Sequence, residues 1–127
     1  MTANDAAKHV VDAAIKVHTL LGPGLLESVY EACLAHELVR RGLKIERQLH
    51  LPIRYDDVRI DAGLRLDLVV ERCLIVELKA SESLLPIHSA QLLTYLKLGG
   101  YPLGLLLNFN VIHMKDGIRR LANGIVD

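Results

Sequence analysis

The sequence predicts an α/β fold in which a central mixed β-sheet is flanked by α-helices. Apolar residues recur at helical spacing up to residue 41, the spacing changes to two over residues 43–79, and a further helical stretch precedes a last apolar strand. The expected order is helix, three or more strands, helix, strand. With 127 residues, of which 51% are hydrophobic, the chain can bury a core, so we expect residues 1–127 to form one domain.

The N-terminal part of the chain is expected to be helical. Over residues 5–21 the helical spacing is carried by Val10, Ala14, Val17 and Leu21. Gly22-Pro23-Gly24 then interrupts the pattern, which predicts that the helix is broken or bent there. A second helical stretch covers residues 25–41, and Gly42 stands where a C-terminal stop is expected.

Beyond Gly42 the alternation of apolar and polar residues predicts β-strands. Residues 43–55 form a long strand, and Asp56-Asp57 supplies a turn after which residues 58–60 can pair back. Residues 64–70 and 74–79 are expected to make two further strands. Four strand segments are therefore predicted before the next helix.

The C-terminal part returns to a helix and then a strand. Pro86 stands where a first helical turn would begin, and residues 87–98 are closed by Gly99-Gly100. The last clear strand covers residues 103–109. Two weaker segments follow, with an edge strand expected over residues 111–114 and either a short helix or a strand over residues 118–125.

The register of the hairpin between residues 64 and 79 decides whether two acids can meet. A two-residue loop would pair Val70 with Cys73 and send Asp67 and Glu77 to opposite faces. A three-residue loop pairs Val70 with Leu74 and brings Asp67 directly opposite Glu77. We favour the second register because it sorts the apolar residues onto one face, which then carries Leu66, Leu68, Val70, Leu74, Val76 and Leu78.

In this register the two acids form a candidate metal site. Opposed carboxylates repel each other unless a positive charge lies between them, and Mg²⁺ favours a few carboxylate oxygens together with waters and phosphates. Lys79 shares the face and could orient or deprotonate a water. The alternative is a surface charge ladder in which the acids pair with Arg65 and Lys79. However, Asp67 and Glu77 interrupt otherwise apolar strands, which such a ladder would not require.

At these residues the sequence resembles the PD-(D/E)XK nuclease superfamily. The superfamily pattern is an acid on one core strand and (Asp/Glu)-x-Lys on the next, matched by Asp67 and by Glu77-Leu78-Lys79. A narrower resemblance, to the GxxExxY group, rests on residues 24–30 (Gly24-Leu25-Leu26-Glu27-Ser28-Val29-Tyr30). The similarity extends from about residue 15 to residue 121. It implies a restriction-endonuclease-like core with the order α-β-β-β-α-β.

The resemblance also implies a set of site residues. Mg²⁺ or Mn²⁺ would be held by Asp67, Glu77 and the backbone carbonyl of Leu78, with Lys79 positioning the attacking water. Glu27 would join from the preceding helix, although an acid early in a helix is also explained by the helix dipole. The implied catalytic residues are thus Glu27, Asp67, Glu77 and Lys79.

Further side chains are candidates for contacting substrate or supporting the site. Tyr30 follows Glu27 by three residues, and Arg65 shares the face of Asp67. His88, Gln91 and Tyr95 form one polar stripe on a helix, and the last two resemble the Gln-x-x-x-Tyr motif of RecB-type members. The alternative for this stripe is a hydrogen-bonded network between helices.

These observations predict a magnesium-dependent nuclease that acts on DNA or RNA. The alternative is a catalytically silent nucleic-acid or protein-interaction module that keeps the nuclease fold. Lys and Arg equal Asp and Glu at 15 each, which counts mildly against a nucleic-acid partner, although an ion bound by the carboxylates would restore positive potential locally. Phosphate contacts or simple solvation would explain the two basic clusters, which comprise Arg40, Arg41, Lys44 and Arg47, and Lys115, Arg119 and Arg120.

The remaining expectations concern location and assembly. Residues 1–12 lack the basic and apolar regions of a signal peptide, and no apolar run approaches the length of a membrane span, so we expect a cytoplasmic protein without a membrane partner. Cys33 and Cys73 have no short-spaced partner and are expected to be free thiols. A homo-oligomer is a possible assembly, because a chain of 127 residues has little surface for enclosing a duplex.

Overall fold

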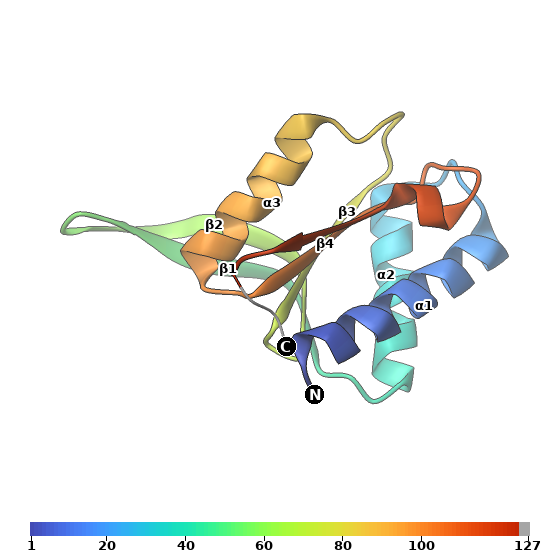
Figure 1. Cartoon of the computed structure of the whole chain (residues 1–127), viewed down its shortest axis with the longest axis horizontal. Coiled ribbons are helices and arrows are strands. Elements are labelled where there is room, and N and C mark those ends of the chain that lie inside the picture. Colours follow the sequence, from blue (N-terminus) through green and yellow to red (C-terminus); the bar gives the residue numbers. More distant parts are fainter. Residues whose placement is uncertain (125–127) are drawn as a thin grey trace.

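A computed structural model describes residues 1–124 of the chain (Figure 1). It contains three α-helices, a five-stranded sheet and a short 3₁₀ helix, so the predicted α/β fold is confirmed. In chain order the elements are α1 (Ala3–Leu21), α2 (Glu27–Arg40), β1 (Ile45–Tyr55), β2 (Val58–Val70), β3 (Leu74–Lys79), α3 (Pro86–Gly99), β4 (Leu103–Asn108), the 3₁₀ helix η1 (Met114–Gly117) and β5 (Ile118–Ala122).

The strands lie side by side in the order in which they occur in the chain. β1, β2 and β3 form an antiparallel meander, β3 pairs with β4 in parallel, and β5 closes the sheet antiparallel to β4. Because parallel neighbours need a crossover connection, α3 spans from the end of β3 to the start of β4. The sheet is therefore mixed, as the sequence predicts.

Helices cover both faces of the sheet (Figure 1). The larger apolar cluster joins α1 and α2 to one face of the sheet, where Leu68, Val70, Val76 and Leu78 are buried. The smaller cluster joins α3 to the other face, where Val69, Ile75, Leu92 and Leu96 are buried among its members. This two-sided burial explains why the central strands contain so few polar residues, and why the acids within them are exceptional.

Two glycines separate α1 from α2. Gly22 and Gly24 have φ angles of 75° and 96°, which glycine adopts without the steric cost of a Cβ. The predicted interruption is thus a full break, and it turns the chain into a new helix that starts at Glu27. Thr2 caps the other end of α1, where its hydroxyl accepts a hydrogen bond from the backbone N–H of Asp5.

The predicted hairpin register between β2 and β3 is confirmed. Val70 pairs with Leu74 and Leu68 with Val76, across a three-residue loop in which Glu71 and Arg72 have positive φ angles. The predicted apolar face is wrong at one position. Leu66 packs in the cluster under α3, whereas Leu68 packs in the cluster under α1 and α2. Alternation is therefore broken between them, at Asp67.

Several element boundaries differ from those expected. The segments 58–60 and 64–70 belong to one strand, β2, because a register shift between Leu51 and Ile53 of β1 lets the pairing continue. The edge strand expected over residues 111–114 is wrong, since this stretch bends into η1. Residues 118–122 form β5, the strand alternative, and residue 125 of that expectation lies outside the described residues.

The distal half of the β1–β2 hairpin projects from the body of the protein as an arm (Figure 1). We define the arm as residues 50–65. Most of its side chains are exposed, and its outer end pairs only with itself, with Tyr55 opposite Val58.

None of the helices in residues 1–124 is long and apolar enough to cross a membrane.

Candidate metal centre

The candidate site lies where β2 and β3 separate. The last backbone pair on this side is Leu68 with Val76, and beyond it side chains take over the bonding between the strands. A carboxylate oxygen of Glu77 accepts a hydrogen bond from the backbone N–H of Asp67 at 3.2 Å. In return, Oδ2 of Asp67 accepts one from the backbone N–H of Leu78 at 3.0 Å. Asp67 and Glu77 are thus brought together, as their predicted register requires.

Burial gives this pair of acids unusual electrostatics. Asp67 is 6% exposed and Glu77 is 7% exposed, and neither forms an ion pair among those found in the described residues. Burial, the side-chain hydrogen bond with Asp67 and the charge of Asp67, in this order of size, together raise the pKa of Glu77 to about 9. Without a bound metal ion, and despite the charge of Lys79, the pair therefore retains a proton at neutral pH.

Glu27 stands at the start of α2, facing the same region. Its pKa is raised first by partial burial and then by the charge of Asp67, whereas the charges of Lys79 and Arg65 lower it. These influences require the groups to lie close together. The helix N-terminus also favours a carboxylate at this position.

Tyr30 supports the position of Glu27 instead of lining the site. Its side chain is fully buried, and its hydroxyl donates to the carbonyl of Gly22 at 2.7 Å and accepts from the N–H of Leu25 at 3.0 Å. Its ring stacks on Phe109, with centroids 4.6 Å apart. Tyr30 therefore fastens the loop that leads into α2, and so fixes where Glu27 begins the helix.

Lys79 ends β3 on the same side of the sheet as Glu77. Its positive charge is near enough to lower the pKa values of both Glu27 and Glu77. Across the parallel ladder its partner is Asn108, which is 2% exposed. The side-chain amide of Asn108 accepts a hydrogen bond from the N–H of Ser81 and donates one to its carbonyl, so the chain just after Lys79 is held in place.

The predicted stripe on α3 is only partly directed at the site. Burial raises the pKa of Tyr95, the charge of Glu77 raises it next, and the hydrogen bond with Gln91 lowers it. The influence of Glu77 shows that Tyr95 lies near the acids. His88 instead turns back to its own helix start, where its Nδ1 accepts a hydrogen bond from the N–H of Leu85 at 3.0 Å. Arg65 is exposed on β2, and its charge lowers the pKa of both Glu27 and Tyr95.

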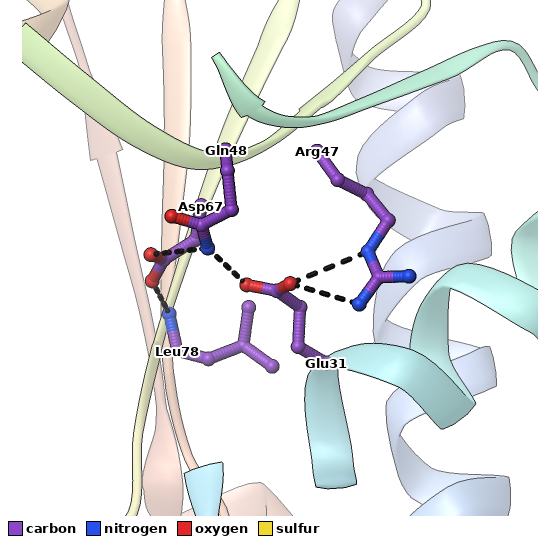
Figure 2. Close-up of polar contacts among 5 residues, drawn as sticks. All are labelled: Glu31, Arg47, Gln48, Asp67 and Leu78. Carbon is purple, nitrogen blue, oxygen red and sulfur yellow. Dashed lines mark hydrogen bonds and ion pairs between the residues drawn. The ribbon is translucent and has the colours of Figure 1, made fainter. Parts of the chain in front are cut away.

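Three residues beside Asp67 were not singled out from the sequence as members of the site (Figure 2). Glu31 of α2 is 8% exposed and accepts hydrogen bonds from the guanidinium of Arg47 and the amide of Gln48. The same amide reaches Oδ1 of Asp67 at 3.3 Å. One signal could have identified Glu31, because it follows Glu27 by four residues and therefore shares a helix face with it.

The donor chemistry of this site suits a hard divalent cation. Its oxygens come from carboxylates and a backbone carbonyl, which Mg²⁺ and Mn²⁺ prefer. The buried amide oxygen of Gln48 lacks a hydrogen-bond partner, and it is the only such buried side-chain atom in residues 1–124. It therefore provides an unused oxygen acceptor beside Asp67. Within the same residues no three His, Cys, Asp or Glu side chains already converge on one point. To hold an ion, Asp67 and Glu77 would have to exchange their backbone partners for it.

Comparison with known proteins agrees with this geometry. A sequence model described as the PD-(D/E)XK nuclease superfamily matches residues 4–121. Searches among curated proteins and among solved structures gave no significant match. The match covers all the candidate site residues described above, from Glu27 to Tyr95.

Proposed function

Because the chain belongs to the PD-(D/E)XK nuclease superfamily, we propose that it hydrolyses phosphodiester bonds of DNA or RNA with the help of Mg²⁺ or Mn²⁺. The observation that carries the proposal is the meeting of Asp67 and Glu77 where β2 and β3 separate. Two buried acids with few compensating charges destabilise a fold, and a bound metal ion would offset that cost. The narrower assignment to the GxxExxY group belongs to this proposal.

Each residue of the site has a separate role in this scheme. Asp67, Glu77, the carbonyl of Leu78 and Glu27 would hold the ion, which when bound supplies charge stabilisation to the phosphodiester and lowers the pKa of water. Lys79 orients the attacking water through its ammonium group. Tyr95 and Gln91, which lie within hydrogen-bond reach of each other, would support the site or contact the substrate at its edge.

The arm supports nucleic acid as the substrate. On one side of the arm His50 lies opposite Arg65 and Arg54 lies opposite Arg59, and the exposed Asp61 pairs with Arg59 at 2.9 Å. Like charges in such positions repel each other, and phosphate groups lying over them would remove that repulsion. The charge of Arg65 lowers the pKa of Glu27, so this row of basic residues begins at the candidate metal centre. Charge placed locally in this way compensates for the zero net charge of the chain.

The second candidate function is a silent binding module with the same fold. It is favoured by one observation, namely that no three potential ligands converge on one point in the described part of the chain. Such a module would bind nucleic acid or protein without turnover and would bind no divalent ion. Calorimetric titration of the protein with Mn²⁺ separates the two candidates, because only the nuclease requires binding.

Cleavage assays test the leading proposal directly. Plasmid, single-stranded DNA and RNA are incubated with Mg²⁺ or Mn²⁺ and with the wild type, Asp67→Ala or Lys79→Ala. We expect the cleavage rate of each variant to fall at least about 100-fold. Lys79→Ala should still bind the metal ion, whereas Asp67→Ala should not. Two exposed residues outside the site supply matched controls, Asp116→Ala and Lys97→Ala. Equal residual cleavage by wild type and both site variants would overturn the proposal.

Two further expectations remain predictions. A homo-oligomer would enlarge the surface available to a duplex, and sedimentation velocity would detect it. A cytoplasmic location agrees with the two cysteines, Cys33 and Cys73, which are both free in the structure.

A further inference from the structure

Gln48 adopts an unusual backbone conformation within β1. Its φ angle is 50°, a left-handed value that is uncommon for residues other than glycine. The pairing register with β2 is the same on both sides, with Arg47 opposite Leu68 and Leu49 opposite Leu66, so the conformation does not serve to change the register. Strained residues of this kind persist where the surrounding structure holds them, and they occur preferentially at functional sites.

The conformation brings two consecutive side chains to the same acid. Consecutive residues of a regular strand point to opposite faces. Here the guanidinium of Arg47 and the amide of Gln48 both bind the carboxylate of Glu31, at 3.1 Å and 2.6 Å (Figure 2). The left-handed residue therefore turns the Gln48 side chain toward α2.

The Gln48 amide joins Glu31 to Asp67. Its Nε2 donates to Oε1 of Glu31 and to Oδ1 of Asp67, so both of its protons have acceptors. This fixes the orientation of the amide, and leaves its oxygen as the one buried side-chain polar atom without a hydrogen-bond partner within residues 1–124. Asp67 is in turn held from two sides, with Oδ1 on Gln48 and Oδ2 on the N–H of Leu78.

We propose that Gln48, anchored by Glu31, is a positioning residue of the metal centre, which orients Asp67 for the ion and offers its own free amide oxygen to the water around that ion. This inference rests on the proposed function. A hydrated Mg²⁺ keeps several waters, so a fixed oxygen acceptor next to one carboxylate ligand can bind one of them. Partners that orient a ligand in this way contribute to metal affinity almost as strongly as the ligands do.

The choice of an amide has a physical reason. A cationic side chain at position 48 would neutralise Asp67 and compete with the metal ion for it. An acidic side chain would repel both Glu31 and Asp67. The neutral amide bridges the two carboxylates while leaving the negative charge of Asp67 for the ion, and Arg47 balances the charge of Glu31.

Two variants separate the side chain from the backbone. Gln48→Asn keeps the amide and tolerates a left-handed backbone well, but its side chain is one methylene shorter and cannot bridge the two acids. Gln48→Gly removes the side chain and relieves the backbone. Ala62→Gly is the matched control, because Ala62 is another left-handed residue, exposed on the arm and away from the acids.

The test measures Mn²⁺ affinity by calorimetry on the full chain, together with the melting temperature in a metal chelator. We expect Gln48→Asn and Gln48→Gly to bind Mn²⁺ about 10- to 100-fold more weakly, and Ala62→Gly to bind like the wild type. The melting temperatures should change by about 5 °C or less, which shows that the fold is retained.

The outcomes distinguish the inference from the function on which it rests. If the wild type binds Mn²⁺ and both Gln48 variants bind it within twofold of the wild type, the inference is overturned and the proposed function is untouched. If the wild type itself binds neither Mn²⁺ nor Mg²⁺, the proposed function is overturned and the inference with it. If Ala62→Gly weakens Mn²⁺ binding as much as Gln48→Gly does, the loss of affinity comes from the change in the backbone. That outcome would also overturn the inference.

Discussion

Glu77 is the single residue whose protonation the fold changes most. Its pKa rises from an ordinary value of 4.5 to about 9, first because it is buried and then because Asp67 lies beside it. Between these two pH values the folded protein holds a proton that the unfolded chain releases. The free energy of unfolding must therefore fall as the pH rises through this window. Below pH 4.5 both states are protonated, so this pH dependence disappears.

Glu77→Gln should remove this dependence, because the amide stays neutral at every pH. In a metal chelator we expect the variant to be more stable than the wild type at pH 8 by about 2–4 kcal/mol, and by much less at pH 5. Urea unfolding at the two pH values measures the difference. Glu82→Gln, at an exposed position in the loop before α3, should leave the pH dependence of the wild type unchanged. Parallel stability curves for wild type and Glu77→Gln would contradict the assignment.

Among the elements, the β1–β2 arm has two chemically different sides. Its cross-strand pairs alternate between pairs of basic residues and apolar pairs, the latter being Leu51 with Leu64, Ile53 with Ile60 and Tyr55 with Val58. Leu51, Ile53 and Leu64 belong to the cluster under α3, so the apolar side continues the core. The cationic side is left exposed next to the site.

Removing the outer cationic pair should weaken nucleic-acid binding without harming the fold. For Arg54→Ala combined with Arg59→Ala, we expect the slope of log K against log salt to fall by about 2, which corresponds to two lost phosphate contacts. The free energy of unfolding should change little, since the variant loses both the repulsion between two opposed arginines and the exposed ion pair of Arg59 with Asp61.

Fluorescence anisotropy at several salt concentrations, performed without cleavage in Ca²⁺, measures this slope. The charge-matched control is Lys8→Ala combined with Lys97→Ala, at exposed positions on α1 and α3 outside the basic clusters, which should keep the salt slope of the wild type. An arm variant with the salt slope of the wild type would exclude the arm from substrate binding.

Metal binding should change the stability of the whole molecule. An ion that binds only the folded state stabilises it by mass action, and at ten times the dissociation constant this amounts to about 1.4 kcal/mol, or roughly 4 °C in melting temperature for a chain of this size. The gain should be larger at pH 8 than at pH 6, because the ion must displace the proton that Glu77 holds.

Scanning calorimetry with and without Mn²⁺ at both pH values tests this expectation. Asp67→Ala combined with Glu77→Ala should show no metal-dependent shift, whereas Asp116→Ala should behave like the wild type. An equal shift in the double variant would place the ion elsewhere in the protein.

Much of this fold could be predicted because its signals are local. The alternation of residues 64–79 and the three-residue loop determine the hairpin register, and that register brings Asp67 to Glu77 whatever the rest of the chain does. Breaks in the pattern at Gly22-Pro23-Gly24 and Gly99-Gly100 similarly locate the helix ends. The same reasoning was wrong over residues 111–114, where a short apolar stretch lacks enough periodicity to distinguish a strand from an irregular turn.

The sequence by itself therefore determined which acids meet, since loop length and alternation are properties of neighbouring residues. Only the tertiary structure decided what surrounds them. It broke the alternation at Gln48 and Asp67, placed Leu66 under α3 instead of beside Leu68, and brought Glu31 to an amide 17 positions away in the chain. These contacts depend on how α2 packs against the twisted sheet, and no periodicity within one segment encodes the position of another.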